Sequence, residues 1–414
     1  MTENILRGKG KLFPLGIGCM RLPTENNKIQ EDVAREFIYY GINNGTNYID
    51  TAYLYHNGES EKFLGKILQG EYRDKINLST KLPSWLISSR SDMDKFLNEQ
   101  LNRLKTDHVE YYYIHSVDYS MLKKLMKLGL AEFIEESKAN GKIKNVGFSY
   151  HGSTEEFADS CDLFDWDCCL IQYNYLDRHI QAGTKGLKYA HSKGMDVVIM
   201  EPLKGGLLAG NMPSEVESLF KEIDSNKTNA QWAFNWVLNH PEVTCVLSGM
   251  GSMDEIKENI QTATNIQPNS LNKTELNTIN KVQEIMHNKL EINCTSCGYC
   301  KPCPFGVDIP ECFRLYNEEF LFEDSNKSFL SHAQMTYYIT VAGVIHKPSH
   351  AGKCINCRQC LSKCPQNIMI PQELKKVSKK FEGHGFGFKV RFLQYVGLPL
   401  LKLYENISTR NNND

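Results

Sequence analysis

The segment NYIDTAYLYHNGESEKFLGKIL, from Asn47 to Leu68, shows the unit from which most of this chain is built. Its first part, YIDTA, has the short apolar pattern of a β-strand, and the part ESEKFLGKIL has the apolar spacing of an amphipathic helix. Pairs of this kind recur eight times before residue 265. Eight strand–helix units in succession predict an α/β fold, a (β/α)8 TIM barrel with its active site at the C-terminal ends of the strands.

The expected elements are read from apolar runs and from helical spacing. The expected strands are 15–20, 48–52, 76–80, 110–116, 145–149, 168–174, 196–200 and 245–249. The expected helices are 30–45, 59–70, 90–105, 121–141, 154–164, 183–194, 229–241 and 252–263. Several of these helices stop at a glycine, as in KANG and HSKG, which is typical of helix C-termini.

Length and composition indicate a folded protein of more than one domain. The chain has 414 residues, of which 41% are hydrophobic, enough for a substantial packed core. Its formal net charge of −2 argues against an electrostatic nucleic-acid binder. The N-terminus lacks the apolar stretch of a secretory signal, and the run FLQYVGLPLL at 392–401 is too short to span a bilayer. We therefore expect a cytoplasmic protein with no transmembrane segment.

Nine of the fourteen cysteines lie between Cys294 and Cys364. The run CINCRQCLSKCP has the spacing C-x2-C-x2-C-x3-C-P of bacterial ferredoxins, in which the fourth cysteine binds the other cluster. The earlier run, CTSCGYCKPCP, is one residue shorter before its fourth cysteine. Two such runs favour two [4Fe–4S] clusters over zinc, which needs only two close pairs. The expected crossed ligand sets are Cys294, Cys297, Cys300 and Cys364, and Cys354, Cys357, Cys360 and Cys303.

The remaining cysteines are expected to be small buried hydrophobic residues. They are Cys19, Cys161, Cys168, Cys169, Cys245 and Cys312.

The fifty residues between the two cysteine runs contain two expected helices, 310–322 and 328–343, an arrangement that resembles α-helical ferredoxins. We expect a barrel in residues 1–285, a small, mainly α-helical ferredoxin-like iron–sulfur domain in 286–374, and a C-terminal tail in 375–414. The tail combines lysines with an apolar run. It either packs back on the barrel, which we favour because glycines interrupt any long helix, or docks an acidic electron-transfer partner or an anionic membrane surface.

Four polar residues fall at or near the C-terminal ends of neighbouring strands: Asp50, Tyr55, Lys81 and His115. Reduction of a carbonyl group needs a proton donor, and an ammonium group beside a phenol favours the phenolate and so makes the phenol a better acid. A carboxylate would hold that ammonium in place, and a histidine could orient the substrate carbonyl. Each residue alone has a structural explanation, but the four together predict a catalytic site.

The segments NYIDTAYLYHNGESEKFLGKIL, STKL and YYIHSVD resemble the aldo-keto reductase family, and the two cysteine runs resemble its subgroup with a C-terminal 4Fe–4S domain. The resemblance implies a (β/α)8 barrel that uses NADPH or NADH without a flavin or a metal. It places the family's catalytic tetrad on the same four residues.

The resemblance also implies positions that contact the nicotinamide cofactor. These are Ser149, Gln172, Met200, Pro202, Leu203, Gly249, Glu258 and Asn259. Tyr150 stands where the family places an asparagine, and Met200 where many members place a tyrosine. Gly249 and Glu255 stand where NADPH-dependent members present basic residues to the 2′-phosphate. Because a glutamate repels a phosphate, we expect NADH to bind at least as well as NADPH.

The two halves differ in electron chemistry, because a nicotinamide transfers a hydride and a cluster transfers single electrons. No G-x-G-x-x-G flavin fingerprint links them. Three hypotheses follow: a carbonyl reductase with structural or sensory clusters, clusters that receive electrons from a ferredoxin or flavoprotein partner, or an electron-transfer and docking protein whose barrel is not a conventional reductase. We prefer the first. The small carbonyl substrate is not readable, although Trp85 and Tyr119 are candidate pocket walls.

Overall fold

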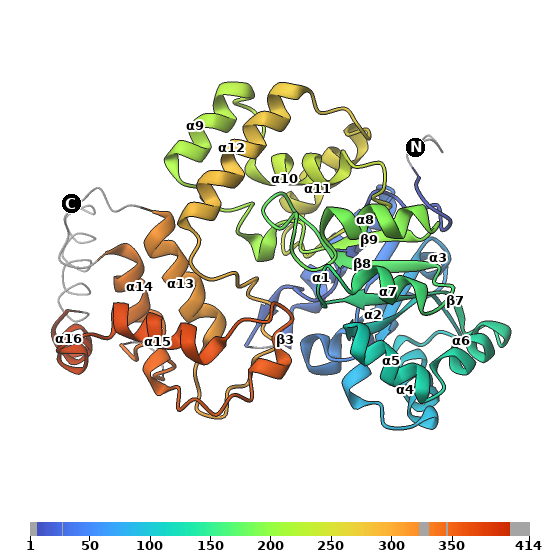
Figure 1. The fold of residues 1–414 in the computed structure, drawn as a ribbon, viewed down its shortest axis with the longest axis horizontal. Coiled ribbons are helices and arrows are strands. Elements are labelled where there is room, and N and C mark those ends of the chain that lie inside the picture. Colours follow the sequence, from blue (N-terminus) through green and yellow to red (C-terminus); the bar gives the residue numbers. More distant parts are fainter. Residues whose placement is uncertain (1–5, 27, 323–330, 345–346, 398–414) are drawn as a thin grey trace, which may run out of the picture. The chain divides into compact units, whose positions relative to one another are not determined.

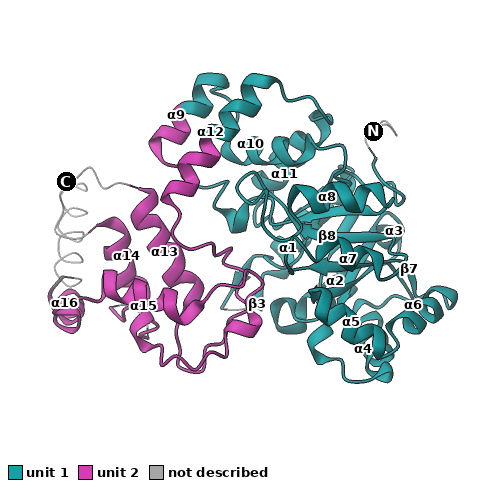
Figure 2. Ribbon diagram, in the orientation of Figure 1, with its two compact units in different colours: residues 1–211, 219–281 teal, residues 212–218, 282–414 magenta. Residues whose placement is uncertain are grey.

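A computed structural model of the protein describes residues 6–26, 28–322, 331–344 and 347–397. The chain divides into two compact units (Figures 1 and 2). Unit 1 comprises residues 1–211 and 219–281, and unit 2 comprises residues 212–218 and 282–414. The division falls within two helices, α9 (Ser214–Ile223) and α12 (Lys273–Lys289). Across the described ranges, no helix has the length and apolar character needed to cross a membrane.

Unit 1 contains a closed barrel of eight parallel strands, which confirms the predicted fold. The strands adjoin in the order β1-β10-β9-β8-β7-β6-β5-β4, and β1 closes on β4. They are β1 (Leu15–Gly18), β4 (Tyr48–Asp50), β5 (Asn77–Leu82), β6 (Val109–Val117), β7 (Ile143–Tyr150), β8 (Cys168–Gln172), β9 (Asp196–Met200) and β10 (Cys245–Ser248). The register pairs Gly18 with Asp50 and Asp50 with Ser79, so the ends of β1 and β4 lie level with the middle of β5, which continues to Leu82.

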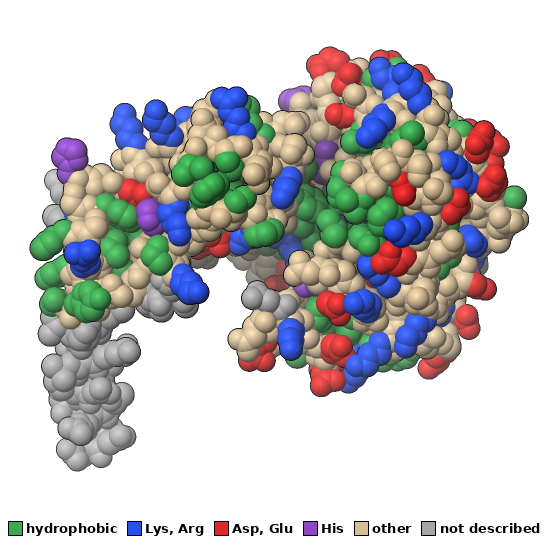
Figure 3. Space-filling view, turned by 90° about the horizontal axis from the view of Figure 1, so that it is seen from below, with side chains coloured by type: hydrophobic (Ala, Val, Ile, Leu, Met, Phe, Trp, Pro, Cys, Tyr) green, Lys and Arg blue, Asp and Glu red, His purple; other side chains and the backbone are tan. Residues whose placement is uncertain are grey.

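Helices surround the strands (Figure 1). They are α1 (Glu31–Asn43), α2 (Glu59–Ile67), α3 (Glu71–Asp74), α4 (Arg90–Leu104), α5 (Tyr119–Lys127), α6 (Leu130–Ala139), α7 (Phe157–Asp162), α8 (Gly183–Ser192), α10 (Asn229–Leu238) and α11 (Met253–Asn265). The single helix expected at 121–141 is wrong: it is divided into α5 and α6, because Gly129 between them has a φ of 89°. On the visible face of unit 1, acidic and basic side chains alternate (Figure 3).

The barrel interior is filled by three tyrosines, Tyr48, Tyr111 and Tyr113, together with cysteine and aliphatic side chains. The hydroxyls of Tyr48 and Tyr113 are 2.9 Å apart, and the Tyr111 hydroxyl donates to Asp196 Oδ2 at 3.0 Å. A buried phenol hydroxyl needs a hydrogen-bond partner, and these contacts let the aromatic rings fill the barrel without leaving a hydroxyl unsatisfied. The six cysteines outside the two motifs are all buried, as expected.

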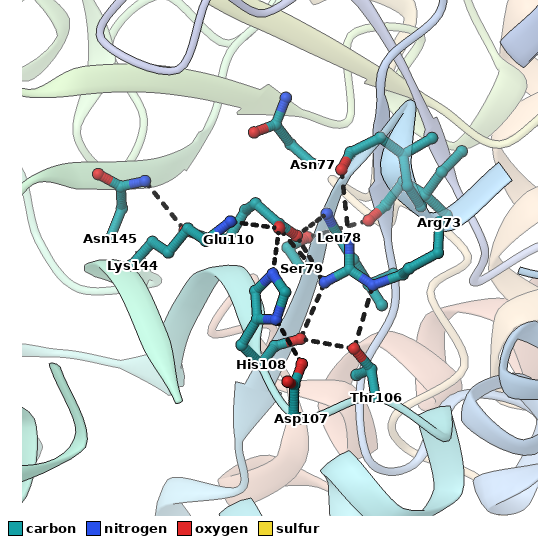
Figure 4. A network of polar contacts seen from close by, with 12 residues as sticks. Arg73, Asn77, Leu78, Ser79, Thr106, Asp107, His108, Glu110, Lys144 and Asn145 are labelled. Carbon is teal, nitrogen blue, oxygen red and sulfur yellow. Dashed lines mark hydrogen bonds and ion pairs between the residues drawn. The ribbon is translucent and has the colours of Figure 1, made fainter. Parts of the chain in front are cut away.

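A polar network lies at the start of β6, at the end of the barrel opposite its mouth (Figure 4). The nearly buried Glu110 contacts Arg73 at 3.0 Å, Lys144 at 3.0 Å and His108 at 2.8 Å, and it accepts the Leu78 N–H at 2.9 Å. Burial opposes ionisation, but the Leu78 N–H, Arg73 and Lys144 outweigh it and lower the pKa of Glu110 from its usual 4.5. The network ties β5, β6 and β7 together.

Unit 2 is helical and has its own hydrophobic core. Its helices are α13 (Ile309–Leu321), α14 (His332–Thr340), α15 (Ile370–Phe381) and α16 (Phe386–Phe392). Asp308 begins α13 by accepting the N–H of Glu311, with Pro310 in the first turn. Buried aromatic side chains from three helices, Phe313, Tyr337 and Phe381, meet in the core.

The C-terminal tail expected at 375–414 begins inside α15. Val377 and Phe381 on this helix are buried in the core of unit 2. Further along, Phe392, Tyr395 and Val396 are exposed, whereas Leu393 packs against the core of unit 2; the packing of the apolar run on the barrel stays a prediction. The rest of that run, 398–401, lies outside the described residues.

Candidate active site and cysteine centre

Three of the four catalytic candidates are in direct contact at the barrel mouth. Lys81, on β5, donates from Nζ to Asp50 Oδ2 at 2.6 Å and to the Tyr55 hydroxyl oxygen at 3.2 Å. The same Nζ donates to the backbone oxygen of Thr51 at 2.7 Å. Asp50 Oδ1 accepts from Ser79 Oγ at 2.6 Å, so both carboxylate oxygens are engaged. Asp50 and Lys81 are buried, and their pairing fixes a positive charge beside the phenol oxygen.

The loop that carries Tyr55 has an unusual backbone conformation. After Tyr55, His56 and Asn57 adopt left-handed φ angles of 51° and 57°. Such angles cost energy in residues other than glycine and persist only where surrounding contacts impose them. Arg103 provides such contacts: Nη1 donates to the backbone oxygen of Tyr53 at 3.3 Å and pairs with the buried Glu61 at 3.1 Å. The loop is therefore held from the α4 side.

The fourth candidate, His115, lies near the end of β6 beside the other three. Its ring centroid is 6.1 Å from that of Tyr55 and 5.2 Å from that of the half-exposed Trp85. Burial, then the charges of Lys81 and His151, lowers the pKa of His115 well below its usual 6.5. His115 is therefore neutral at physiological pH and can donate one hydrogen bond to a substrate oxygen.

A cleft of about 260 Å3 opens beside Asp50 and Tyr55. Its lining includes residues from β1, from the segment after β9, and from the end of β10. Four of the cofactor residues expected from the sequence belong to this lining: Met200, Pro202, Leu203 and Gly249. The cleft therefore extends from Tyr55 to the segments in which the sequence analysis expects contacts with the cofactor.

The eight motif cysteines of unit 2 fall into two spatial groups. Burial raises the pKa of Cys300, and the nearby thiols of Cys297, Cys294 and Cys364 raise it further. Burial likewise raises the pKa of Cys360, together with its neighbours Cys354, Cys357 and Cys303. Each group thus contains three cysteines of one run and the fourth cysteine of the other. These are the sets that crossed ligation requires, and the ligation itself stays a prediction.

Each group offers four thiols, which is the ligand set of a [4Fe–4S] cluster. Among the described residues, no three His, Cys, Asp or Glu side chains converge closely enough to hold one metal ion. In a [4Fe–4S] cluster each thiolate binds a different iron, so four thiolates stand further apart. Six of the eight motif cysteines, all except Cys297 and Cys357, pack against the apolar core of unit 2, which would limit the access of water to such a cluster.

The model of the aldo/keto reductase family matches residues 14–284. This chain belongs to the aldo-keto reductase family. A second match, to a 4Fe–4S dicluster domain, covers residues 293–370 and hence both cysteine runs. The barrel and the helical unit thus correspond to two family models.

Similar proteins are found among characterised and uncharacterised oxidoreductases. L-galactose dehydrogenase of Arabidopsis thaliana is 24% identical over 323 residues, 70% of this chain and 97% of that protein. The uncharacterized oxidoreductase YqkF of Bacillus subtilis is 25% identical over 282 residues, 60% of this chain and 86% of that protein.

Solved structures show the same barrel. The holo form of an aldo-keto reductase from Bacillus halodurans is 26% identical with a TM-score of 0.55, covering 67% of this chain and 95% of that one. An aldo-keto reductase from Klebsiella pneumoniae, in complex with NADPH, is 21% identical with a TM-score of 0.56, covering 68% and 96%. The second likeness concerns the fold alone.

In this aldo-keto reductase, the two residues expected at the nicotinamide carboxamide are buried and already hydrogen-bonded. Ser149 Oγ accepts the N–H of Ser116 at 3.3 Å. Gln172 Nε2 donates to Asp177 Oδ2 at 2.7 Å, and Asp177 in turn pairs with the buried Lys204 at 2.7 Å. Because Asp177 holds the amide nitrogen, the orientation of the Gln172 side chain is fixed.

The residues expected around the adenosine, Glu258 and Asn259, lie in the middle of α11. Asn259 is buried, with Nδ2 3.4 Å from Ser248 Oγ, and Glu258 accepts from Thr228 Oγ1 at 2.6 Å. Glu255 is exposed and accepts the Gly251 N–H at 2.8 Å. Its carboxylate thus stays at the helix terminus, where an incoming phosphate would meet a negative charge.

One partly buried histidine of the barrel mouth was not identified from the sequence. Tyr150 packs its ring against Phe157 and donates its hydroxyl to the backbone oxygen of Ser153 at 2.6 Å, away from the mouth. The next residue, His151, is close enough to His115 to affect its charge, and burial lowers the pKa of His151 to about 4. The sequence feature that could have indicated this residue is the histidine directly after Tyr150 in GFSYHG.

Proposed function

We propose that this aldo-keto reductase reduces a small carbonyl compound, an aldehyde or a ketone, with NADH or NADPH as hydride donor. The observation that carries the proposal is the contact of Lys81 Nζ with both the Tyr55 hydroxyl and the Asp50 carboxylate. A lone tyrosine is a weak acid, and this arrangement is suited to making it a stronger one.

In the proposed reaction, Tyr55 donates the proton of its hydroxyl to the carbonyl oxygen of the substrate. Lys81 stabilises the negative charge left on the phenol oxygen, and Asp50 keeps the ammonium in position. Neutral His115 donates a hydrogen bond to the same carbonyl oxygen and orients it. Trp85, whose ring lies beside that of His115 at a tilt, would exclude water from one side of the substrate.

The bound nicotinamide would supply the hydride. Residues of the cleft would hold it along the barrel mouth, and the hydrogen-bonded side chains described above would hold its two ends. The proposed contacts are Met200, Pro202, Leu203 and Gly249 along the cleft, Ser149 and Gln172 at the carboxamide, and Glu258 and Asn259 at the adenosine. The aldo-keto reductase from Klebsiella pneumoniae, which shares this fold, is solved in complex with NADPH, and the proposal gives this barrel a cofactor of the same class.

For the C-terminal part we propose two [4Fe–4S] clusters, used for electron transfer or for structure. The functional division that we propose places the reductase in residues 1–285, the clusters in 286–374 and a tail in 375–414. The eight cysteines favour a second candidate function: an electron-transfer protein that works with a ferredoxin or flavoprotein, its barrel no longer a conventional reductase. Carbonyl reduction by itself requires no one-electron centre.

Replacement of Tyr55 tests the first function. We expect Tyr55→Phe to lower kcat for aldehyde reduction by at least about 100-fold, with little change in cofactor affinity, because only the proton donor is removed. Tyr53→Phe is the matched control, since its hydroxyl lies 3.3 Å from Glu99 instead of facing Lys81. If Tyr55→Phe keeps most of its kcat, or if both variants lose activity equally, the tyrosine is not the acid and the second function gains weight.

A further inference from the structure

The loop that carries the second cysteine motif is the most exposed part of the cysteine centre. Residues 355–359 of this loop, which we call the second cysteine loop, are all exposed, including Cys357. By contrast, Cys294, Cys297 and Cys300 of the first motif are only partly exposed. A cluster held by the second group would therefore have one edge near the protein surface.

The surroundings of this loop carry positive charge without nearby negative charge in the sequence. From Ser325 to Gln372 the chain contains five lysines and arginines but no aspartate or glutamate. Arg358 and Lys363 flank Cys360, and both side chains are exposed. No ion pair within the described residues involves either of them. Two acidic residues near the motifs are engaged in ion pairs: Asp308 with Lys301 at 2.8 Å, and Glu382, which also accepts the Gly352 N–H at 2.9 Å, with His350 at 3.0 Å.

Apolar side chains are exposed beside these charges. Ile355 is 62% exposed, Met369 is 51% exposed and Phe305 is 39% exposed. Ile355, Phe305 and Arg358 line one cavity together with the four cysteines of the second group, so these side chains lie directly beside the proposed cluster site. On the visible face of unit 2, at the left of Figure 3, hydrophobic, Lys and Arg side chains predominate and little Asp or Glu is seen. An exposed apolar patch with a charged rim is typical of a protein-binding surface.

We propose that the second cysteine loop, with Arg358, Lys363 and Ile355, is the docking surface for a small acidic protein that carries single electrons. Positive charge around a redox centre attracts an acidic carrier and orients it on encounter. Complexes of electron carriers bury little surface and are transient. The proposal rests on the cluster assignment made above and is independent of the carbonyl reductase activity.

The electron balance of the step is simple. One electron leaves the reduced carrier, which becomes oxidised by one electron, and enters the iron–sulfur centre held by Cys354, Cys357, Cys360 and Cys303. No bond forms or breaks and no proton is transferred. The carrier is the reductant, so the step needs no further reactant.

The test uses the full-length protein, purified anaerobically, and an acidic bacterial two-cluster ferredoxin as the probe. Its Kd is measured with labelled ferredoxin, and the rate of cluster reduction by dithionite-reduced ferredoxin is measured by stopped flow. At low ionic strength we expect the double variant Arg358→Glu with Lys363→Glu to weaken binding by at least about tenfold, and we expect the effect to shrink as salt screens the charges.

Lys379→Glu with Arg391→Glu is the matched control. Both residues are exposed in unit 2, and Lys379 lies about 13 Å along α15 from its first residue. We expect this equal change of charge to alter Kd by less than about threefold. Three results would each overturn the proposal. The two double variants could lose ferredoxin affinity equally, the first double variant could keep the wild-type Kd, or the wild-type protein could fail to bind ferredoxin at low salt.

Two further measurements separate the possible causes of a loss. Iron and acid-labile sulfide are determined in every variant, and Arg358→Gln with Lys363→Gln replaces the first variant if reversal of charge costs iron. Aldehyde reduction is assayed in parallel. If that activity is missing while ferredoxin binding depends on Arg358 and Lys363, the proposed barrel function fails and the docking surface stands.

Discussion

Lys81→Met is the most informative change in the barrel, because one atom of Lys81 contacts both neighbouring catalytic candidates. At 3.2 Å and an effective dielectric constant of about 20, the ammonium stabilises a negative phenol oxygen by about 5 kcal/mol. The Asp50 carboxylate, 2.6 Å from the same nitrogen, lies within about 6 Å of the phenol oxygen and opposes this by about 3 kcal/mol. The net stabilisation is about 2 kcal/mol.

These values bracket the expected loss of activity. If Asp50 takes up a proton when its partner is removed, the net term of about 2 kcal/mol is lost and kcat falls about 30-fold. If Asp50 remains ionised, the full term of about 5 kcal/mol is lost and kcat falls about 5,000-fold. The assay is steady-state oxidation of NADH or NADPH with an aromatic aldehyde, together with a fluorescence titration of cofactor affinity.

A second buried pair provides the control for this prediction. Lys204 pairs with Asp177 at 2.7 Å, much as Lys81 pairs with Asp50 at 2.6 Å. The Lys204 pair contacts Gln172, through Asp177, whereas the Lys81 pair contacts Tyr55, through Lys81. We expect Lys204→Met to raise the KM for the cofactor more than it lowers kcat, whereas Lys81→Met does the reverse. A decrease in kcat of less than about threefold for Lys81→Met would refute the assignment of Lys81 to the proton step.

Three further predictions concern other parts of the molecule. Contacts in the native state lower the pKa of Glu110, so its contribution to stability is present above pH 4.5 and is lost as the pH falls below that value. We therefore expect Glu110→Gln to lower the free energy of unfolding at neutral pH by about 1–3 kcal/mol and to make it less sensitive to acid. Urea unfolding at several pH values measures both effects. Glu255→Arg should improve NADPH binding relative to NADH, whereas Asp254→Arg on the same helix turn should do so less; a wild-type protein that already binds NADPH tenfold tighter would contradict this. Cys364→Ser should remove about four of about eight irons and the spectrum of the cluster at the first motif, whereas Cys312→Ser should remove none; loss of only the other cluster would contradict crossed ligation.

The barrel could be predicted from the sequence because each strand is a short apolar run followed by a helix with regular spacing. All eight strands were found at the expected positions. The break between α5 and α6 could not be predicted from spacing, since the apolar pattern continues through Gly129, and only the backbone angle reveals it. The two-residue strands β2 (Thr24–Glu25) and β3 (Lys28–Ile29) are too short to show a period.

The candidate site was predictable where chemistry follows position along a strand. Asp50 and Lys81 meet because their strands are neighbours in the barrel, a relation that the strand order already implied. The direction of a side chain after a strand end was not predictable. Tyr150 turns toward α7 and His151 approaches His115 because the local backbone and the packing of Phe157 decide which side chain faces the mouth.

The interleaved grouping of the cysteines also has a consequence for biosynthesis. In the proposed arrangement Cys364 completes the set begun by Cys294, seventy residues earlier in the chain. At about 5–20 residues per second, a ribosome needs about 4–14 s to add those residues. Throughout that interval the first three thiols wait without their fourth ligand and are open to oxidation. Iron and sulfide can thus be inserted in full only after translation has passed the second motif, and a message truncated before it yields a chain with no complete centre.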